Sequence, residues 1–296
     1  MPRYWSFLVI RDKFSTQKVK EALRMAKGRF ETIKLYNLFA DDLFRLSKTL
    51  RRASPAVKTL YYETTECSSI IALASLRLKP ESLIIRNEDL RRHPIYGQLK
   101  PLLGPTLRTL SLHRVTGPRH DLKQYNSLLA SLTSLSITGF GFIRVDLLHH
   151  ITTIQEIMLD FNEELHIPDY NTRNISLPYL RVFKLRGVPC PMQTNFPSLS
   201  VHAPMLHTFH LDSTTAAFWL LTFCDPSAPA AIVDFRVDQP TGPIMTLSHL
   251  QPFLCDTIES FALTSVSYDL GPLLRDIHAG RTLPRRKHLE FTFNDD

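Results

Sequence analysis

Glycine is scarce in this chain, with 10 among 296 residues. A nucleotide-binding loop needs glycines that let the backbone approach a phosphate, and no such glycine-rich loop is present in the sequence. The sequence also has no G-x-S-x-G nucleophile motif and no H-E-x-x-H metal motif. Adjacent carboxylates such as Asp41-Asp42 are typical of helix capping. These absences predict a protein that is not an enzyme and that has no catalytic residues and no cofactor.

Cysteine is also scarce, with four residues, and long apolar runs are missing. The four cysteines lie without paired spacing at Cys67, Cys190, Cys224 and Cys255, which indicates a reducing compartment rather than a disulfide framework. The most apolar later run, Ala216–Phe223, is far shorter than the roughly 20 residues that a membrane span needs. We therefore expect an intracellular protein of the cytoplasm or nucleus, without a transmembrane segment.

A short apolar phrase, ideally L-x-x-L-x-L, recurs twelve times along the chain. From Ile154 it restarts after four successive steps of 26 residues, at Leu180, Leu206, Ile232 and Ile258. This phrase and period are typical of leucine-rich repeats, in which each repeat adds one strand to a curved parallel sheet. The sequence therefore predicts an α/β leucine-rich-repeat solenoid of about twelve repeats of roughly 26 residues, with helices and irregular loops on its convex side.

Two positions of the phrase are apolar in every copy. Position 4 holds Phe7, Ile33, Leu60, Leu83, Leu110, Leu135, Ile157, Phe183, Phe209, Phe235, Phe261 and Leu289. Position 6 holds Val9, Leu35, Tyr62, Ile85, Leu112, Ile137, Leu159, Leu185, Leu211, Val237, Leu263 and Phe291. Because successive side chains of a strand point to opposite faces, positions 4 and 6 are predicted to share the core face, and positions 3, 5 and 7 the other face.

One solenoid is expected over residues 1–296, in two parts of different composition. Residues 1–165 form the helix-rich part, because apolar residues recur there at helical spacing, at Gln17–Arg29, Asp41–Ala53, Ser68–Leu78 and Leu122–Leu132. Residues 166–296 are rich in proline, with 13 of the 20 prolines beyond residue 165, so irregular loops are expected. Helices are still predicted in that part, near Ala216–Phe223, Thr246–Leu254 and Leu270–Ala279.

The concave face of the sheet is the predicted binding surface. Its positions 5 and 7 carry charged and aromatic side chains, and tyrosine and arginine are enriched in the residues that dominate protein interfaces. The predicted protein-binding residues are Lys34, Tyr36, Tyr61, Arg86, His113, Asp160, Lys184, Arg186, His210, Asp212, Arg236 and Asp238. Opposite charges on neighbouring strands could instead pair with one another, an alternative that the sequence leaves open.

The repeat phrase is followed by Gly-Val or Ser-Val in copies such as Arg186-Gly-Val188 and Thr264-Ser-Val266, and in this it resembles the repeat region of fungal F-box proteins. In that family, irregular leucine-rich repeats form the substrate-binding part of a cullin-type ubiquitin ligase. The resemblance implies a non-enzymatic protein–protein interaction scaffold that recognises substrates for ubiquitin ligation. No helical F-box fits before Tyr4, so a cullin-ligase adaptor is expected as a partner only if an F-box is missing from the N-terminus of this chain.

An alternative function follows from the uneven charge. The first 100 residues hold 20 Lys and Arg against 10 Asp and Glu, whereas the remaining residues hold 15 against 18. The N-terminal third could therefore bind nucleic acid or another acidic surface. Its basic clusters, such as Arg51-Arg52, fall on expected helices without interleaved aromatic residues, which disfavours nucleic acid.

The histidines at His202, His207 and His210 are the most suggestive set for metal binding. Their spacing is not that of a zinc site, and the alternation of the strand would place His207 and His210 on opposite faces. The sequence therefore predicts no metal site.

Overall fold

The structure, a computed structural model, describes residues 7–27, 29–53, 56–88, 101–114, 130–139, 151–161, 174–187, 200–213, 220, 223, 231–238, 250–264 and 271–292. The chain forms two compact units, Met1–Phe142 and Ile143–Asp296. Together the two units contribute twelve strands of parallel sheet, six from each unit, with few helices. This mixed α/β architecture is compatible with the predicted solenoid. The number of repeats and the division of the chain at residue 165 stay predictions.

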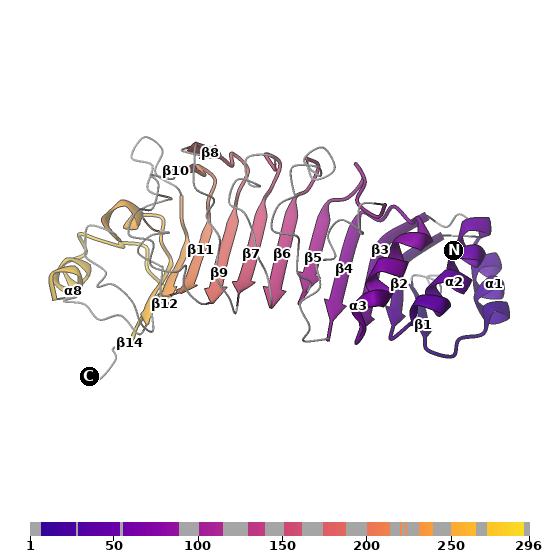
Figure 1. Cartoon of the computed structure of the whole chain (residues 1–296). Helices are drawn as coiled ribbons and strands as arrows, with labels where there is room; N and C mark the ends of the chain where they lie inside the picture. The colour runs from indigo at the N-terminus through magenta and orange to yellow at the C-terminus, as the bar shows by residue number, and fades with distance from the viewer. Residues whose placement is uncertain are drawn as a thin grey trace. The chain divides into compact units, whose positions relative to one another are not determined.

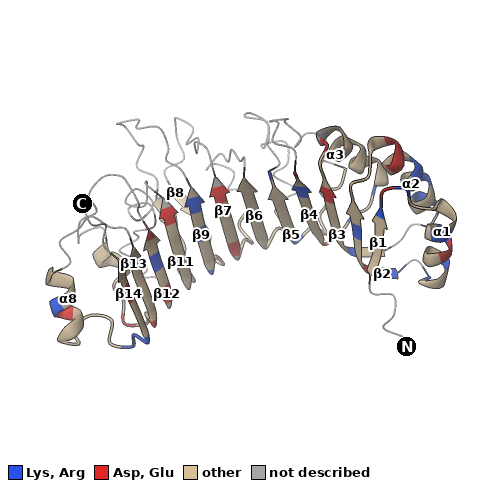
Figure 2. Cartoon of the chain, turned by 90° about the horizontal axis from the view of Figure 1, so that it is seen from below, with Lys and Arg blue, Asp and Glu red and all other residues tan. Residues whose placement is uncertain are grey.

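The first unit alternates strands and helices in its N-terminal part (Figure 1). Its elements are β1 (Phe7–Arg11), α1 (Thr16–Met25), β2 (Arg29–Tyr36), α2 (Ala40–Ala53), β3 (Ala56–Thr64), α3 (Cys67–Leu73), the 3₁₀ helix η2 (Ala74–Leu76), β4 (Ser82–Asn87), β5 (Thr109–His113) and β6 (Ser134–Gly139). Each strand pairs in parallel with the next one along the chain. Figures 1 and 2 show α1, α2 and α3 together on one side of these strands.

The helices of the first unit lie close to their predicted positions, with shifts at their C-terminal ends. The helix expected over Gln17–Arg29 ends at Met25, because Lys27 takes a left-handed conformation with φ of 52° and Arg29 already begins β2. The helix expected over Ser68–Leu78 ends as a 3₁₀ turn before Arg77, which is also left-handed. Helix α2 confirms the prediction at Asp41–Ala53. Of the helix predicted at Leu122–Leu132, residues 122–129 lie outside the described part of the chain.

The second unit contains β7 (Glu156–Phe161), β8 (Asn174–Ser176), β9 (Val182–Gly187), β10 (Ser200–His202), β11 (Thr208–Ser213), β12 (Asp234–Asp238), the 3₁₀ helix η5 (Gln251–Phe253), β13 (Ser260–Thr264), α8 (Gly271–His278) and β14 (His288–Thr292). Strands β7, β9, β11, β12, β13 and β14 pair in that order, and β8 and β10 form a separate parallel pair. Helix α8 confirms the helix predicted at Leu270–Ala279. At Thr246–Leu254 the described residues contain only Leu250 and η5 as helix, and most of Ala216–Phe223 lies outside the described residues.

The 26-residue period appears in the backbone hydrogen bonds of the second unit. The carbonyl oxygen just before each strand accepts the amides of two consecutive residues in the next repeat. These acceptors are Gln155, Arg181, His207, Val233 and Glu259, each 26 residues after the one before. The repeated phrase therefore places the same backbone contact at the start of successive strands.

The two predicted core columns are confirmed from β2 to β13. Strand pairing aligns the position 4 residues with one another and the position 6 residues with one another, as in Phe183–Phe209–Phe235–Phe261. From Ile33 to Phe261 the position 4 side chains are at most 2% exposed. In the last strand, Leu289 is 37% exposed, so the column is less buried at that end.

The predicted register of the first strand is wrong by one residue. Leu8 pairs with Ile33 and Ile10 with Leu35, so these two residues occupy positions 4 and 6 in place of Phe7 and Val9. Ile10 is 2% exposed, whereas Phe7 is 61% and Val9 42% exposed. Residues 7–10 are all apolar, so the strand has no alternation from which its buried face could be predicted.

Candidate functional site

The open face of each unit is the sheet face that carries positions 3, 5 and 7 of the repeat. All twelve residues predicted to bind protein lie on it, in the predicted strand register. Lys34, Tyr36, Tyr61, Arg86 and His113 belong to the first unit, and Asp160, Lys184, Arg186, His210, Asp212, Arg236 and Asp238 belong to the second. Each is half-buried or exposed. Figure 2 shows both signs of charge interspersed along the strands of the two units.

In the first unit the open face carries four side chains in mutual contact, Arg11, Tyr36, Tyr61 and Arg86, which we call the aromatic–cation row. The Arg11 guanidinium lies 5.6 Å from the centre of the Tyr36 ring, and the Arg86 guanidinium 5.8 Å from that of Tyr61. The two tyrosine rings lie 5.5 Å apart and are tilted by 48°. Cations over aromatic faces and tilted ring pairs are both attractive arrangements, so the row holds its own side chains in place across four strands.

Glu63 lies beside this row and accepts a hydrogen bond from the Tyr61 hydroxyl. Burial, reinforced by the hydrogen bond and the negative charge of Glu63, raises the pKa of Tyr61 to about 12. Tyr61 is therefore protonated at physiological pH and serves as a hydrogen-bond donor. At the other end of the same unit, the His113 imidazole is hydrogen-bonded to the Thr138 hydroxyl.

In the second unit the predicted residues form a charge ladder, made of Asp160, Lys184, Arg186, His210, Asp212, Arg236 and Asp238. Strand pairing brings Arg186 between Asp160 and Asp212, and the Arg186 Nε lies 3.1 Å from a carboxylate oxygen of Asp212. Both side chains remain largely exposed, so the pair contributes little to stability, about 0–1 kcal/mol. Pairing between neighbouring strands, the alternative that the sequence left open, is thus present here.

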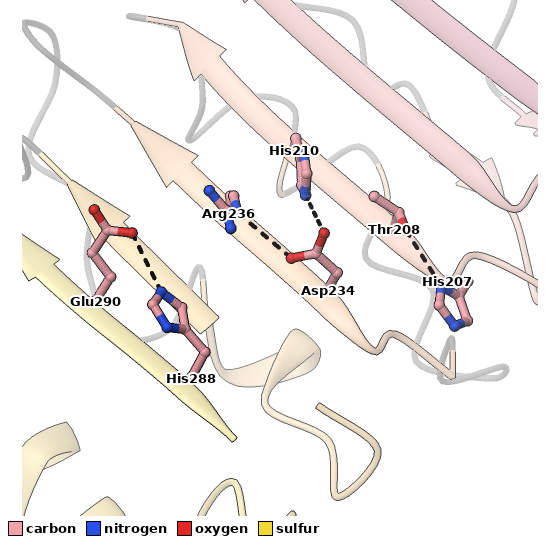
Figure 3. Close-up of polar contacts among 7 residues, drawn as sticks. All are labelled: His207, Thr208, His210, Asp234, Arg236, His288 and Glu290. Atoms are coloured by element: carbon pink, nitrogen blue, oxygen red, sulfur yellow. Dashed lines mark hydrogen bonds and ion pairs between the residues drawn. The ribbon is translucent and has the colours of Figure 1, made fainter. Parts of the chain in front are cut away.

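Asp234 at position 3 joins two members of this ladder (Figure 3). Its carboxylate lies 2.7 Å from His210 Nε2 and 3.6 Å from Arg236 Nε. Burial lowers the pKa of His210, and Asp234 opposes this effect without reversing it. Burial also raises the pKa of Asp212, and the charge of Asp238 adds to that increase. The ladder therefore consists of interacting charges and not of independent ones.

The stability of the second unit should depend on pH through His210. Because the pKa of His210 is lowered in the folded protein, the unfolded chain takes up this proton at a higher pH than the folded chain does. Its contribution to stability is therefore complete above about pH 6.5 and is lost as the pH falls below that value. We expect urea unfolding to show a smaller loss of stability between pH 7.5 and 5 for His210→Gln than for the unsubstituted protein.

Substitution of His278, an exposed histidine at the end of α8, supplies the matched control variant. His278→Gln should keep the pH dependence of the unsubstituted protein. If His210→Gln also keeps it, the burial of a neutral His210 beside Asp234 is contradicted.

Several residues of the open face were missed by sequence reasoning. Phe7, Val9 and Arg11 were missed because the register of β1 was wrong, and the corrected register places them at positions 3, 5 and 7. Asp234 was missed because position 3 was not included in the predicted surface. Its position one residue before the core phenylalanine Phe235, which alternation assigns to the open face, was the available signal.

Neither a metal site nor a membrane span is found in the described part of the chain. No three of its His, Cys, Asp or Glu side chains are grouped as metal ligands would be. His202 belongs to β10, whereas His207 precedes β11 and its ring contacts the Thr208 hydroxyl at 3.3 Å. None of the described helices has both the length and the apolar character needed to cross a membrane.

Comparison with protein-family models, curated proteins and solved structures finds no match to this chain.

Proposed function

We propose that this protein is a non-enzymatic scaffold for protein–protein interaction and that it binds its partner on the open face of its parallel sheet. The single observation that carries the proposal is the side-chain register. In both units it buries one apolar face and presents, strand after strand, rows of charged, aromatic and hydroxyl side chains on the other. Such a surface offers many weak polar contacts together with tyrosine and arginine anchors, as protein interfaces do.

The resemblance of the repeats to fungal F-box proteins extends this proposal. We propose that the partner is a substrate to be presented to a ubiquitin ligase inside the cell, and that a cullin-ligase adaptor joins the complex if an F-box belongs to the full protein. This part is supported by the repeat phrase alone, so it needs a test that is separate from the test of the surface.

Affinity capture from a lysate of the source cells tests both parts. The tagged chain, an Arg186→Glu, Arg236→Glu double variant and an Arg281→Glu control are compared by quantitative mass spectrometry. Arg281 is an exposed residue of the same unit that pairs with Asp276 away from the strands, so its reversal changes charge without changing the open face. A thermal melt of each variant confirms that the fold is retained.

We expect at least one protein to be captured by the unsubstituted chain and by Arg281→Glu, and to be reduced about tenfold or more with the double variant, which is a loss of roughly 1.4 kcal/mol. Equal capture by all three chains would contradict binding at this surface. Cullin-ligase adaptors among the captured proteins would support the ubiquitin-ligase role, and their absence would leave a scaffold without that role.

A further inference from the structure

The first unit has apolar side chains exposed on its open face, next to the aromatic–cation row. Phe7 is 61% and Val9 42% exposed, and both lie on β1 beside Arg11. On the neighbouring strands, Lys34 pairs with Val9 and Tyr61 pairs with Lys34. Ile84 on β4 pairs in turn with Tyr61, so these four residues occupy the same position on four successive strands. Cations and apolar groups are therefore adjacent on one surface that spans four strands.

The cations of this surface differ from Arg186 and Arg236 of the charge ladder in having no acidic partner in the described part of the chain. Among the residues that the structure describes, Arg11, Lys34 and Arg86 form no ion pair. In the second unit, by contrast, Arg186 and Arg236 already lie beside Asp212 and Asp234. These two arginines of the second unit thus already have acidic partners, whereas Arg11, Lys34 and Arg86 of the first unit are available to a ligand.

The side chains of Arg11 and Arg86 are also held in an arrangement that suits carboxylate binding. A guanidinium stacked on an aromatic ring loses freedom before binding and still presents its N–H groups at its edge, where a carboxylate can accept two of them. Glu63, an acidic side chain beside the row, already accepts a hydrogen bond from the Tyr61 hydroxyl. Among its described residues, the surface therefore offers the three cations Arg11, Lys34 and Arg86 beside a carboxylate that already has a partner.

We infer that this surface, made of Phe7, Val9, Arg11, Lys34, Tyr61 and Arg86, binds an extended acidic segment of a partner protein in which acidic and apolar residues alternate. Carboxylates of the segment contact Arg11, Lys34 and Arg86, and its apolar side chains cover Phe7 and Val9. Arg11 and Arg86 lie three strand steps apart, roughly 14 Å, which an extended segment of about five residues spans. The inference deepens the proposed scaffold function and rests on it only in taking the ligand to be a protein.

The packing of the tyrosines favours a protein segment over single-stranded nucleic acid. Nucleic-acid platforms on sheets use free aromatic faces on which bases stack. Here the rings of Tyr36 and Tyr61 contact each other, and each also has an arginine over it. A base would have to displace these contacts, whereas a carboxylate binds the edges of the arginines and leaves the row intact.

The test measures binding of fluorescein-labelled probes to the full chain by fluorescence anisotropy, at about 0.15 M salt so that nonspecific attraction is screened. The probes are a short peptide of alternating Glu and Leu or Phe, the same peptide with Gln in place of Glu, and oligo(dT) of similar length. The variants are Arg11→Gln with Arg86→Gln, and Phe7→Ser. The control is Lys20→Gln with Arg24→Gln, which removes two exposed charges from α1 of the same unit.

We expect the Glu peptide to bind at least about tenfold more tightly than the Gln peptide and the oligonucleotide. The Arg11, Arg86 variant and Phe7→Ser should each weaken it by about tenfold or more, and the α1 control by less than about twofold. The inference is overturned if the Glu peptide does not bind, if the Gln peptide binds equally well, or if the α1 control weakens binding as much. Tighter binding of oligo(dT) that the Arg11, Arg86 variant removes would assign the surface to nucleic acid instead.

This experiment and the capture experiment fail independently of each other. Loss of a captured partner on reversal of Arg186 and Arg236, without any binding of the Glu peptide, would retain the scaffold and reject the acidic segment. Equal capture by all chains would reject the scaffold's binding surface in the second unit, whatever the peptide does.

Discussion

Replacing Phe209 with alanine is expected to lower the free energy of unfolding of the second unit by about 3–5 kcal/mol. Phe209 is fully buried, and its ring contacts four other phenylalanines, two of them in the neighbouring strands of the same column. It lies parallel to Phe253 of η5, with ring centres 5.5 Å apart. The substitution removes contacts in two directions, along the column and toward η5, and the neighbouring strands are too constrained by their pairing to close the cavity.

Urea unfolding followed by circular dichroism measures this effect. The matched control is Tyr179→Ala, an aromatic residue of the same unit that is 54% exposed and should change stability by less than about 1 kcal/mol. If Phe209→Ala unfolds at the same urea concentration as the control, the phenylalanine column is not the core of this unit.

The second large effect concerns the corrected register of β1. Ile10→Ala is expected to lower the free energy of unfolding by about 2–5 kcal/mol, because Ile10 is buried and pairs with Leu35, the next residue of the position 6 column. Val9→Ala, one residue away on the open face, is expected to change stability by less than about 0.5 kcal/mol. The two substitutions remove similar side chains from the same strand, so their difference reports which face is buried.

Both variants are measured by the same urea titration, followed by a probe of the first unit such as amide hydrogen exchange of β2. A larger effect from Val9→Ala than from Ile10→Ala would restore the register first predicted from the sequence. It would also remove Phe7 and Val9 from the open face, and with them the apolar part of the proposed acidic-segment surface.

Most of the sheet could be predicted from the sequence because the alternation within each repeat is enough to identify the buried face of its own strand. In copies such as Leu206–Leu211, the residues between the apolar positions are polar, so only one face can be the buried one. The prediction failed at β1 because four consecutive apolar residues fit either face. There the register is decided by pairing with β2, a contact between residues about 25 positions apart that local alternation does not encode.

The residues of the candidate site were predictable, but their interactions were not. Alternation placed Tyr36, Tyr61 and Arg186 on the open face, since that depends only on counting along a strand. Which charges pair depends on the offset between strands and on rotamers. Arg186 contacts Asp212 on the adjacent strand, whereas Arg236 lies nearest to Asp234 of its own strand. The contact of Arg11 with the Tyr36 ring likewise could not be predicted, because it depends on the register of β1.

The two units would present different surfaces to a partner. A partner that bound the open face of the second unit would compete with the existing ion pairs of Arg186 and Arg236, so it would gain specificity from charge pattern more than affinity from charge. A partner that bound the first unit would meet cations already held in place by aromatic rings, next to exposed apolar side chains, and would gain affinity from both. The two units are therefore expected to recognise different features of a partner.

Hydroxyl-radical footprinting of the folded chain, read by mass spectrometry, measures which face of the sheet is buried and which is exposed. We expect strong modification of Phe7 and Met158, which are 61% and 42% exposed, and more modification of Tyr61 than of the fully buried Tyr62 beside it. We also expect protection of the buried column at Phe183, Phe209, Phe235 and Phe261. Equal modification of Tyr61 and Tyr62, or modification of the phenylalanine column at the level of Phe7, would show that the sheet does not bury one face and expose the other.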